Sequence, residues 1–221
     1  MVEAVLRARR RKAGERLALA AARYAALGWP VCAGAWLLGR HPGQAAAGRA
    51  CSCDRIGCPA PGAHPLSPAW QLTASADACV VAARWGAVPR ASILLATGRA
   101  FDVLDVPEAA GPAALRRIER AGIGPGPVAL GAGGRMLFFV ASRAAHADDD
   151  EWWSCHLDCV PEAVPAATGL RWHCRDSYVL APPSPLAGGL AARWITEPGA
   201  GPLPDALRLL VPLADACEET D

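Results

Sequence analysis

The sequence contains almost no lysine, since Lys12 is the only lysine among the 22 basic residues of its 221 positions. Lys12 lies in an Arg-Arg-Arg-Lys-Ala-Gly-Glu run, so the chain has no Gly-Lys-Ser/Thr phosphate loop. A Schiff-base lysine would have to be Lys12 itself, and a solvated basic run does not favour that role. No serine lies in a Gly-x-Ser-x-Gly elbow. P-loop NTPases, lysine Schiff-base enzymes and α/β-hydrolases are therefore disfavoured.

The sequence also lacks a large net charge and a long apolar run. Its formal net charge is +1, which gives no global attraction to nucleic acid but permits a local basic patch. The most apolar stretch, 18–38, contains Arg23, Gly28 and Pro30 and is a poor membrane span, and we find no signal peptide. We therefore expect a cytoplasmic protein with reduced thiols that does not bind membranes.

The order of helical and strand patterns predicts an α/β (α+β) fold. Residues 1–28 contain a basic amphipathic helix, from residue 2, whose apolar stripe we expect to pack on the domain. Its basic face could contact phosphates or anionic lipid, or could simply be solvated, and both interpretations stay open. The acidic tail from Asp215 is expected to fray. Further predicted elements are helices at 75–85 and 112–121, and strands at 92–97, 101–106, 136–140, 168–172 and 177–181.

A cysteine cluster lies in the irregular segment 39–68, which is rich in glycine and proline. Cys51, Cys53, Cys58 and His64 have the spacing C-x-C-x4-C-x5-H, and four such ligands can complete a tetrahedral shell around zinc. Because all four positions come from the protein, the predicted Zn²⁺ has a structural role. The alternative is a surface loop with unbound cysteines.

A second cysteine group follows Trp152 and Trp153. Cys155 and Cys159, together with the later Cys174, could bind another metal. Cysteine and tryptophan are more commonly buried packing residues, so core or interface packing is the competing interpretation.

Several motifs occur in a characteristic order along the chain. They include Cys51-Ser-Cys53, Phe101-Asp-Val-Leu-Asp-Val106, Gly131-Ala-Gly-Gly134 and Tyr178-Val-Leu-Ala-Pro-Pro-Ser184. This ordered set, over residues 15–190, resembles the bifunctional primase–polymerase domain of the archaeo-eukaryotic primase superfamily. The resemblance implies a two-lobed domain with an RRM-like sheet and a zinc-stapled loop at 51–64. Residues 191–221 are then a C-terminal extension with an acidic tail.

Active members of that family make or extend primers from nucleoside triphosphates on a DNA template, with carboxylates that hold Mg²⁺ or Mn²⁺. The family's first motif has two carboxylates two residues apart at a strand end, on one face. Asp105 matches the first carboxylate and is the candidate catalytic residue, but Pro107 replaces the second. Asp102, at an offset of three, is expected on the opposite face, and Glu108 lies beyond the proline.

The second and third motifs also depart from the family pattern. Met136 stands where the resemblance implies a phosphate-contacting histidine, although Arg135, with Gly133 and Gly134 in the preceding turn, could still contact nucleotide phosphates. If Arg171 is the arginine of the third motif, Gly169 occupies the position where that motif has an aspartate. Asp176 is nearby but does not have the spacing of the motif.

Three functions remain open from the sequence. The first is a degenerate primase–polymerase domain that binds nucleotide, DNA or a protein partner in DNA replication without chemistry. Another is an active metal-dependent DNA primase/polymerase with an atypical site around Asp105. The last is an unrelated zinc-stapled interaction protein. Because the chain has no phosphate loop, we expect any helicase function to come from a protein partner.

Overall fold

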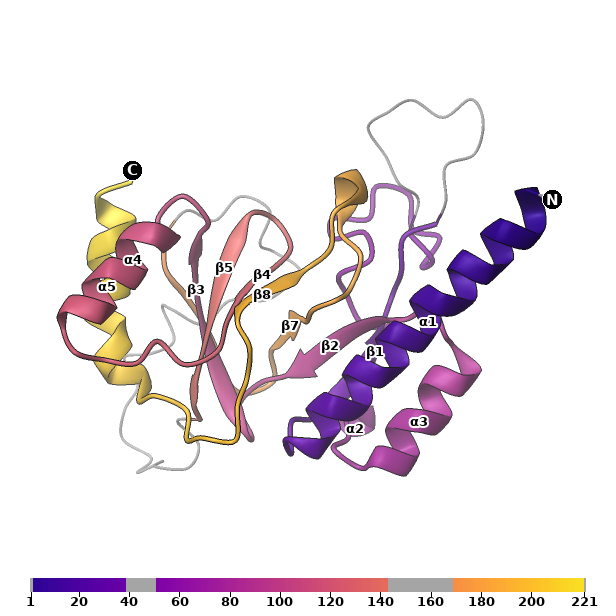
Figure 1. Cartoon of the computed structure of the whole chain (residues 1–221), viewed down its shortest axis with the longest axis horizontal. Coiled ribbons are helices and arrows are strands. Elements are labelled where there is room, and N and C mark those ends of the chain that lie inside the picture. The colour runs from indigo at the N-terminus through magenta and orange to yellow at the C-terminus, as the bar shows by residue number, and fades with distance from the viewer. Residues whose placement is uncertain (1, 39–50, 143–168, 221) are drawn as a thin grey trace. The chain divides into compact units, whose positions relative to one another are not determined.

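The computed structural model describes residues 2–38, 51–142 and 169–220 (Figure 1). The fold is α+β, with two antiparallel sheets. The chain divides into two compact units, of which the first comprises Met1–Leu95 with Leu180–Ala192 and the second comprises Ala96–Val179 with Arg193–Asp221.

The first unit contains the Cys3His loop and most of a three-stranded sheet with strand order β1-β2-β7. Val31 of β1 lies opposite Leu95 of β2 in an antiparallel pair. Asp77 caps α3, since its side chain accepts hydrogen bonds from the N–H groups of Cys79 and Val80. The elements are α1 (Val2–Ala26), β1 (Val31–Gly34), α2 (Trp70–Thr73), α3 (Ala78–Ala87), β2 (Ser92–Ala96), β7 (Tyr178–Leu180) and the short 3-10 helix η4 (Ala187–Gly189).

The described residues of α1 that are buried against the unit lie from Gly14 onward. Leu17, Ala21 and Tyr24 recur at helical spacing, are each at most 5% exposed, and face the core. The Tyr24 hydroxyl donates to the carbonyl of Pro182 at 2.6 Å. In contrast, Ala13 is exposed, so the apolar stripe predicted from the sequence does not run the length of the helix. Gly14 is the first described residue of α1 that is buried, and a Cβ added there would lie 3.0 Å from the carbonyl oxygen of Pro89.

The second unit is a five-stranded sheet with order β6-β3-β5-β4-β8 and two helices on one face. Every adjacent pair of strands is antiparallel. The elements are β3 (Phe101–Pro107), α4 (Gly111–Arg120), β4 (Val128–Leu130), β5 (Arg135–Ala141), β6 (Arg171–His173), β8 (Arg193–Thr196) and α5 (Ala206–Glu218).

The two faces of this sheet have different partners. Leu104 and Val106 of β3 pack with Ile118 of α4 and with Leu209 and Leu213 of α5 in one core. Because side chains alternate along a strand, Val103 and Asp105 project from the opposite face. That second face also contains Phe139, whose ring packs at a tilt against Phe101 and Trp194 with ring centroids 5.4 and 5.1 Å away.

The C-terminal segment is more ordered than the sequence predicts. We expected fraying from Asp215, but α5 continues to Glu218, and Ala216 and Cys217 are buried. Asp205 caps the helix, and apolar residues at helical spacing fix it to the sheet despite the internal Pro212. Within the described residues, no helix has both the length and the apolar character that a bilayer crossing requires.

Candidate functional site

Asp105 lies at the centre of a buried charge cluster on the sheet face opposite α4 and α5. Arg135 of the neighbouring strand β5 donates from Nε to Asp105 Oδ1 at 2.8 Å, and its Nη2 also bonds this oxygen. Arg171 of β6, on the other side of β3, places Nε 3.4 Å from the same oxygen. The three side chains are between 3% and 6% exposed. Two guanidinium groups therefore share one carboxylate.

His173 completes the cluster from β6. Its Nε2 lies 2.9 Å from Asp105 Oδ2, and its Nδ1 lies 3.0 Å from the Ser177 hydroxyl. An ionised carboxylate can only accept hydrogen bonds, so Nε2 carries the proton toward Asp105. The order Asp105–His173–Ser177 resembles that of a hydrolase triad, but Ser177 is only 5% exposed. We therefore assign this chain of hydrogen bonds a structural role.

These contacts keep Asp105 ionised. Burial would raise the pKa of its carboxyl, but the hydrogen bond and charge of His173, with the charges of Arg135 and Arg171, bring that pKa below its usual value. The charge balance of the cluster is nevertheless positive, since one carboxylate faces two guanidinium groups and an imidazole. A cluster with this balance favours anions over divalent cations.

The two acidic residues nearest to Asp105 in the sequence, Asp102 and Glu108, lie outside its cluster. Asp102 projects toward the other face, as the offset of three predicts, and there its oxygens accept from Ser142 Oγ and Trp172 Nε1, each at 3.2 Å. Glu108 is exposed beyond β3. Pro107 shares the face of Asp105 and lies opposite Arg135 in the register of β3 and β5. The position of the missing second carboxylate is thus adjacent to a guanidinium group.

The structure separates Met136 from this face. Met136 packs in the core against Gly111 of α4, so a side chain at that position could not reach Asp105. Arg135 is the residue of this strand that faces Asp105, whereas the family resemblance implied a histidine at the position of Met136. Gly133 and Gly134 form the exposed turn before Arg135, with φ of 69° and 66°.

The third motif also lies next to the cluster. Arg135 Nη2 donates to the carbonyl of Gly169 at 2.6 Å, so the position where an aspartate was expected contributes a backbone oxygen. Asp176 is exposed in a turn at φ 59°. The sequence singled out Asp105 and Arg135, but the joint role of Arg171, His173 and Ser177 depends on strand pairing that no local pattern reveals.

The Cys3His loop forms the strongest candidate metal site. Ligand atoms of Cys51, Cys53, Cys58 and His64 all lie within 4.8 Å of one another. His64 Nδ1 donates to the carbonyl of Pro65 at 2.9 Å, and its Nε2 lies 3.3 Å from Cys51 Sγ. A histidine ligand commonly fixes its ring in this way, with one nitrogen on a carbonyl and the other facing the metal. The cluster could therefore hold zinc, as the spacing predicts.

The pKa values of two thiols in the cluster shift in opposite directions. Burial would raise the pKa of Cys53, but a backbone hydrogen bond at Arg55 and hydrogen bonds with Cys51, His64 and Cys58 lower it to about 7. Burial raises the pKa of Cys58 to about 11, and the neighbouring Cys53 and Cys51 thiols add to that shift. Thiols this close repel one another once ionised, and a bound cation removes that repulsion.

The second predicted metal site stays untested. Cys155 and Cys159 lie outside the described residues. Cys174 is partly buried, and its carbonyl accepts from Thr97 Oγ1 at 2.6 Å. Among the residues that the structure describes, the Cys3His loop is the only group of three or more histidine, cysteine or acidic side chains close enough to share a metal.

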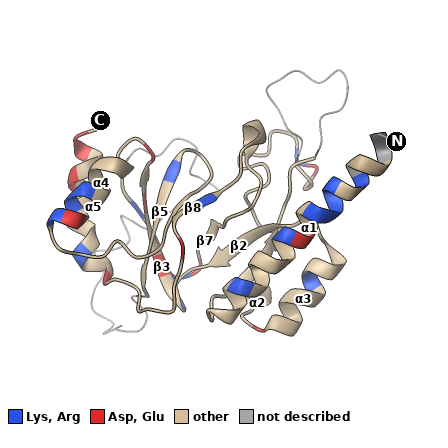
Figure 2. Ribbon diagram, in the orientation of Figure 1, with Lys and Arg blue, Asp and Glu red and all other residues tan. Residues whose placement is uncertain are grey.

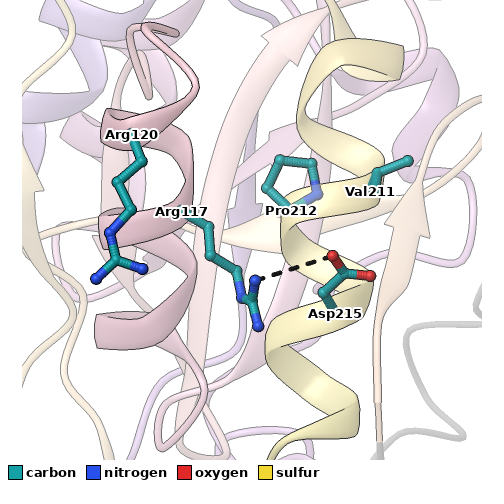
Figure 3. A pocket seen from close by; sticks show the side chains of 5 residues that line it. All are labelled: Arg117, Arg120, Val211, Pro212 and Asp215. Atoms are coloured by element: carbon teal, nitrogen blue, oxygen red, sulfur yellow. Dashed lines mark ion pairs between the residues drawn. The ribbon is translucent and has the colours of Figure 1, made fainter.

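A surface pocket lies elsewhere on the second unit. Arg117 and Arg120 of α4 and Val211, Pro212 and Asp215 of α5 line it, and Arg117 points toward Asp215 at 4.0 Å (Figure 3). Both helices cover the sheet face opposite Asp105. The pocket is therefore separate from the charge cluster.

Comparison with known proteins agrees with the motifs. Residues 21–214 match the family model described as bifunctional DNA primase/polymerase, N-terminal. No curated protein and no solved structure matches the chain. The family match spans both compact units and includes the Cys3His loop and the Asp105 cluster.

Proposed function

Since this chain belongs to the bifunctional DNA primase/polymerase N-terminal family, we propose that it is a degenerate member that binds nucleotide or nucleic-acid phosphates in DNA replication without templated polymerisation. Membership removes the alternative of an unrelated zinc-stapled protein. The proposal includes a structural Zn²⁺ in the Cys3His loop, a cytoplasmic location, and a protein partner for any helicase function.

The observation that carries this proposal is the ion pairing of the Asp105 carboxylate with Arg135 and Arg171. Nucleotidyl transfer needs two or three carboxylates that converge on divalent cations. On the described part of this sheet face, Asp105 is the single carboxylate, and Arg135 and Arg171 already occupy it. A cation at Asp105 would have to displace or approach two guanidinium groups in a buried site, where charge repulsion is poorly screened.

Phosphate binding fits the same surroundings better. The exposed Gly133–Gly134 turn leads directly into Arg135, and two successive residues at positive φ present backbone to solvent without side chains. A phosphate at this turn would meet backbone amides and the positive charge of the adjacent cluster. The proposed contact residues are therefore Gly133, Gly134 and Arg135, as the sequence suggested.

Nucleotide incorporation on primed and unprimed DNA templates, with Mg²⁺ or Mn²⁺, tests the absence of polymerisation. We expect no product from the folded, zinc-loaded protein. Incorporation that is lost in Asp105→Asn but kept in Glu108→Gln would overturn the proposal and establish the active alternative. Glu108 is a matched control because it is exposed and its substitution changes the charge equally.

Retention of a deoxynucleoside triphosphate in buffer without added divalent cation tests the binding role. Buffers passed over a metal-chelating resin are preferable to a soluble chelator, which would strip the Cys3His loop. We expect Gly133→Asp to weaken retention and Gly133→Asn to preserve it, since both side chains tolerate positive φ and differ in charge. Equal retention in the two variants, or none in the wild type, would contradict phosphate binding at this turn.

A further inference from the structure

The first half of α1 carries a concentrated positive charge. Arg9, Arg10, Arg11 and Lys12 are consecutive, and Figure 2 shows the basic residues along this helix. Every residue from Arg7 to Ala13 is exposed. Consecutive residues of an α-helix are about 100° apart, so these four side chains surround the helix axis. The exposed half is therefore basic on all sides.

From Arg7 to Arg16 there are six basic residues and one acidic residue, Glu15. Arg11 Nη1 lies 3.7 Å from Glu15 Oε1, in a pair whose side chains are 80% and 61% exposed. Lys12 and Arg16 are four residues apart, and like charges at that spacing destabilise a helix. Arg7–Ala13 present no apolar stripe, so packing against the unit does not offset the repulsion between these like charges. A bound polyanion would remove this repulsion.

The basic surface continues onto the body of the first unit. Burial and the positive charge of Arg10 lower the pKa of Arg90, so Arg10 and Arg90 are close enough to interact. Arg90 lies over the Trp36 ring, 5.7 Å from its centroid, and its Nη2 donates to the carbonyl of Leu37 at 3.2 Å. This second arginine is held in place by the fold. A polyanion on α1 would reach it as well.

We propose that the exposed half of α1, Arg7–Ala13, lies in the major groove of duplex DNA and contacts the phosphates of both strands. The major groove of B-form DNA is about 12 Å wide and admits an α-helix. A helix that is basic on all sides can meet both phosphate walls of that groove at once. These seven residues span about 10 Å, at 1.5 Å per residue. This inference deepens the proposed function because it names duplex DNA as the partner.

Other polyanions fit this helix less well. A helix at a lipid surface buries a continuous apolar face, and the ring of basic residues leaves none. Single-stranded nucleic acid is held largely by aromatic stacking, whereas the one aromatic residue of α1, Tyr24, is 4% exposed. Duplex RNA has a major groove too narrow and deep to admit protein elements. Duplex DNA is therefore the partner that the geometry favours.

Fluorescence anisotropy with a labelled 20-base-pair DNA duplex, at several NaCl concentrations between 50 and 200 mM, tests this proposal on the full zinc-loaded chain. The test variant is the triple substitution Arg9→Gln, Arg10→Gln, Lys12→Gln. The control is Arg116→Gln, Arg120→Gln, Arg208→Gln on exposed positions of α4 and α5, which removes the same charge. Glutamine retains helix propensity in both.

We expect the α1 triple variant to lose at least about tenfold in affinity at 50 mM NaCl, and the slope of log K against log[NaCl] to become shallower by about 2 to 3. The control should bind as the wild type. The proposal would be overturned if both variants lost affinity equally or if the α1 variant lost none. Tighter binding to single-stranded DNA, duplex RNA or anionic vesicles than to duplex DNA would also overturn it. Triphosphate retention by the α1 variant is a separate readout, so this inference and the proposed function can fail independently.

Discussion

Arg135 Nε donates a hydrogen bond to Asp105 Oδ1 at 2.8 Å, from a strand register in which Arg135 lies opposite Pro107. The residue that faces the missing second carboxylate is therefore the one that neutralises the remaining carboxylate. An acid at position 107 would therefore also have this guanidinium group for a neighbour. Asp105 is thus an ion-paired carboxylate, held by Arg135 and Arg171.

Removal of Asp105 should destabilise the fold strongly. Asp105→Ala leaves Arg135 and Arg171 buried without their shared carboxylate, and breaking a buried pair in this way costs about 3–5 kcal/mol. Glu108→Gln, at an exposed position, should change the free energy of unfolding by less than about 0.5 kcal/mol. Urea unfolding followed by circular dichroism measures both. Similar stabilities for the two variants would mean that the cluster is not a structural ion network.

The contribution of Asp105 to stability should depend on pH in a defined direction. The folded-state pKa of Asp105 is lowered, so the unfolded chain binds its proton more readily. The stabilisation is therefore present above the unfolded value, about 3.9, and is lost as the pH falls through the lower folded value. The difference in unfolding free energy between wild type and Asp105→Asn should be constant from pH 5 to 7 and shrink below pH 4. A difference that grows on acidification would contradict the assignment.

Much of the fold and the Cys3His spacing could be predicted from local patterns, but the contacts within the Asp105 cluster could not. Strands 101–106 and 136–140 were correct to within a residue or two, because apolar runs bounded by turn residues report burial directly. The helix at 206–218 was missed because Pro212 interrupts its pattern, yet Leu209 and Leu213 hold it on the sheet. His173 and Asp105 are 68 residues apart, and only the pairing of β6 with β3 brings them together. No sequence periodicity encodes that contact.

Zinc should hold the 51–64 loop in place. We expect one Zn²⁺ per chain by elemental analysis, and Cys53→Ser should abolish it and lower the melting temperature. Cys79→Ser is the matched control, because Cys79 is an exposed free thiol outside the cluster. Since metal binding and loop folding are coupled, a chelator should lower the melting temperature of the wild type and leave that of Cys53→Ser unchanged. Zinc retained by Cys53→Ser, or a chelator effect equal in both proteins, would contradict a Cys3His site.

The turn after β2 should be intolerant of any side chain. Gly98 adopts φ +83°, and a Cβ there would lie 2.2 Å from Cα of Arg175, in the loop between His173 and Ser177. Gly98→Ala must therefore displace this loop, and with it the imidazole that bonds Asp105. We expect a loss of at least about 2 kcal/mol in unfolding free energy, the range for strained backbone combined with a buried clash. Gly124→Ala is the control, since nothing lies within 4 Å of its Cβ, and it should change stability by less than about 0.5 kcal/mol.

Histidine NMR resonances report the site itself: the His173 signals should shift in Gly98→Ala and stay in place in Gly124→Ala. Equal stability and unchanged His173 signals in Gly98→Ala would show that this loop does not position the histidine.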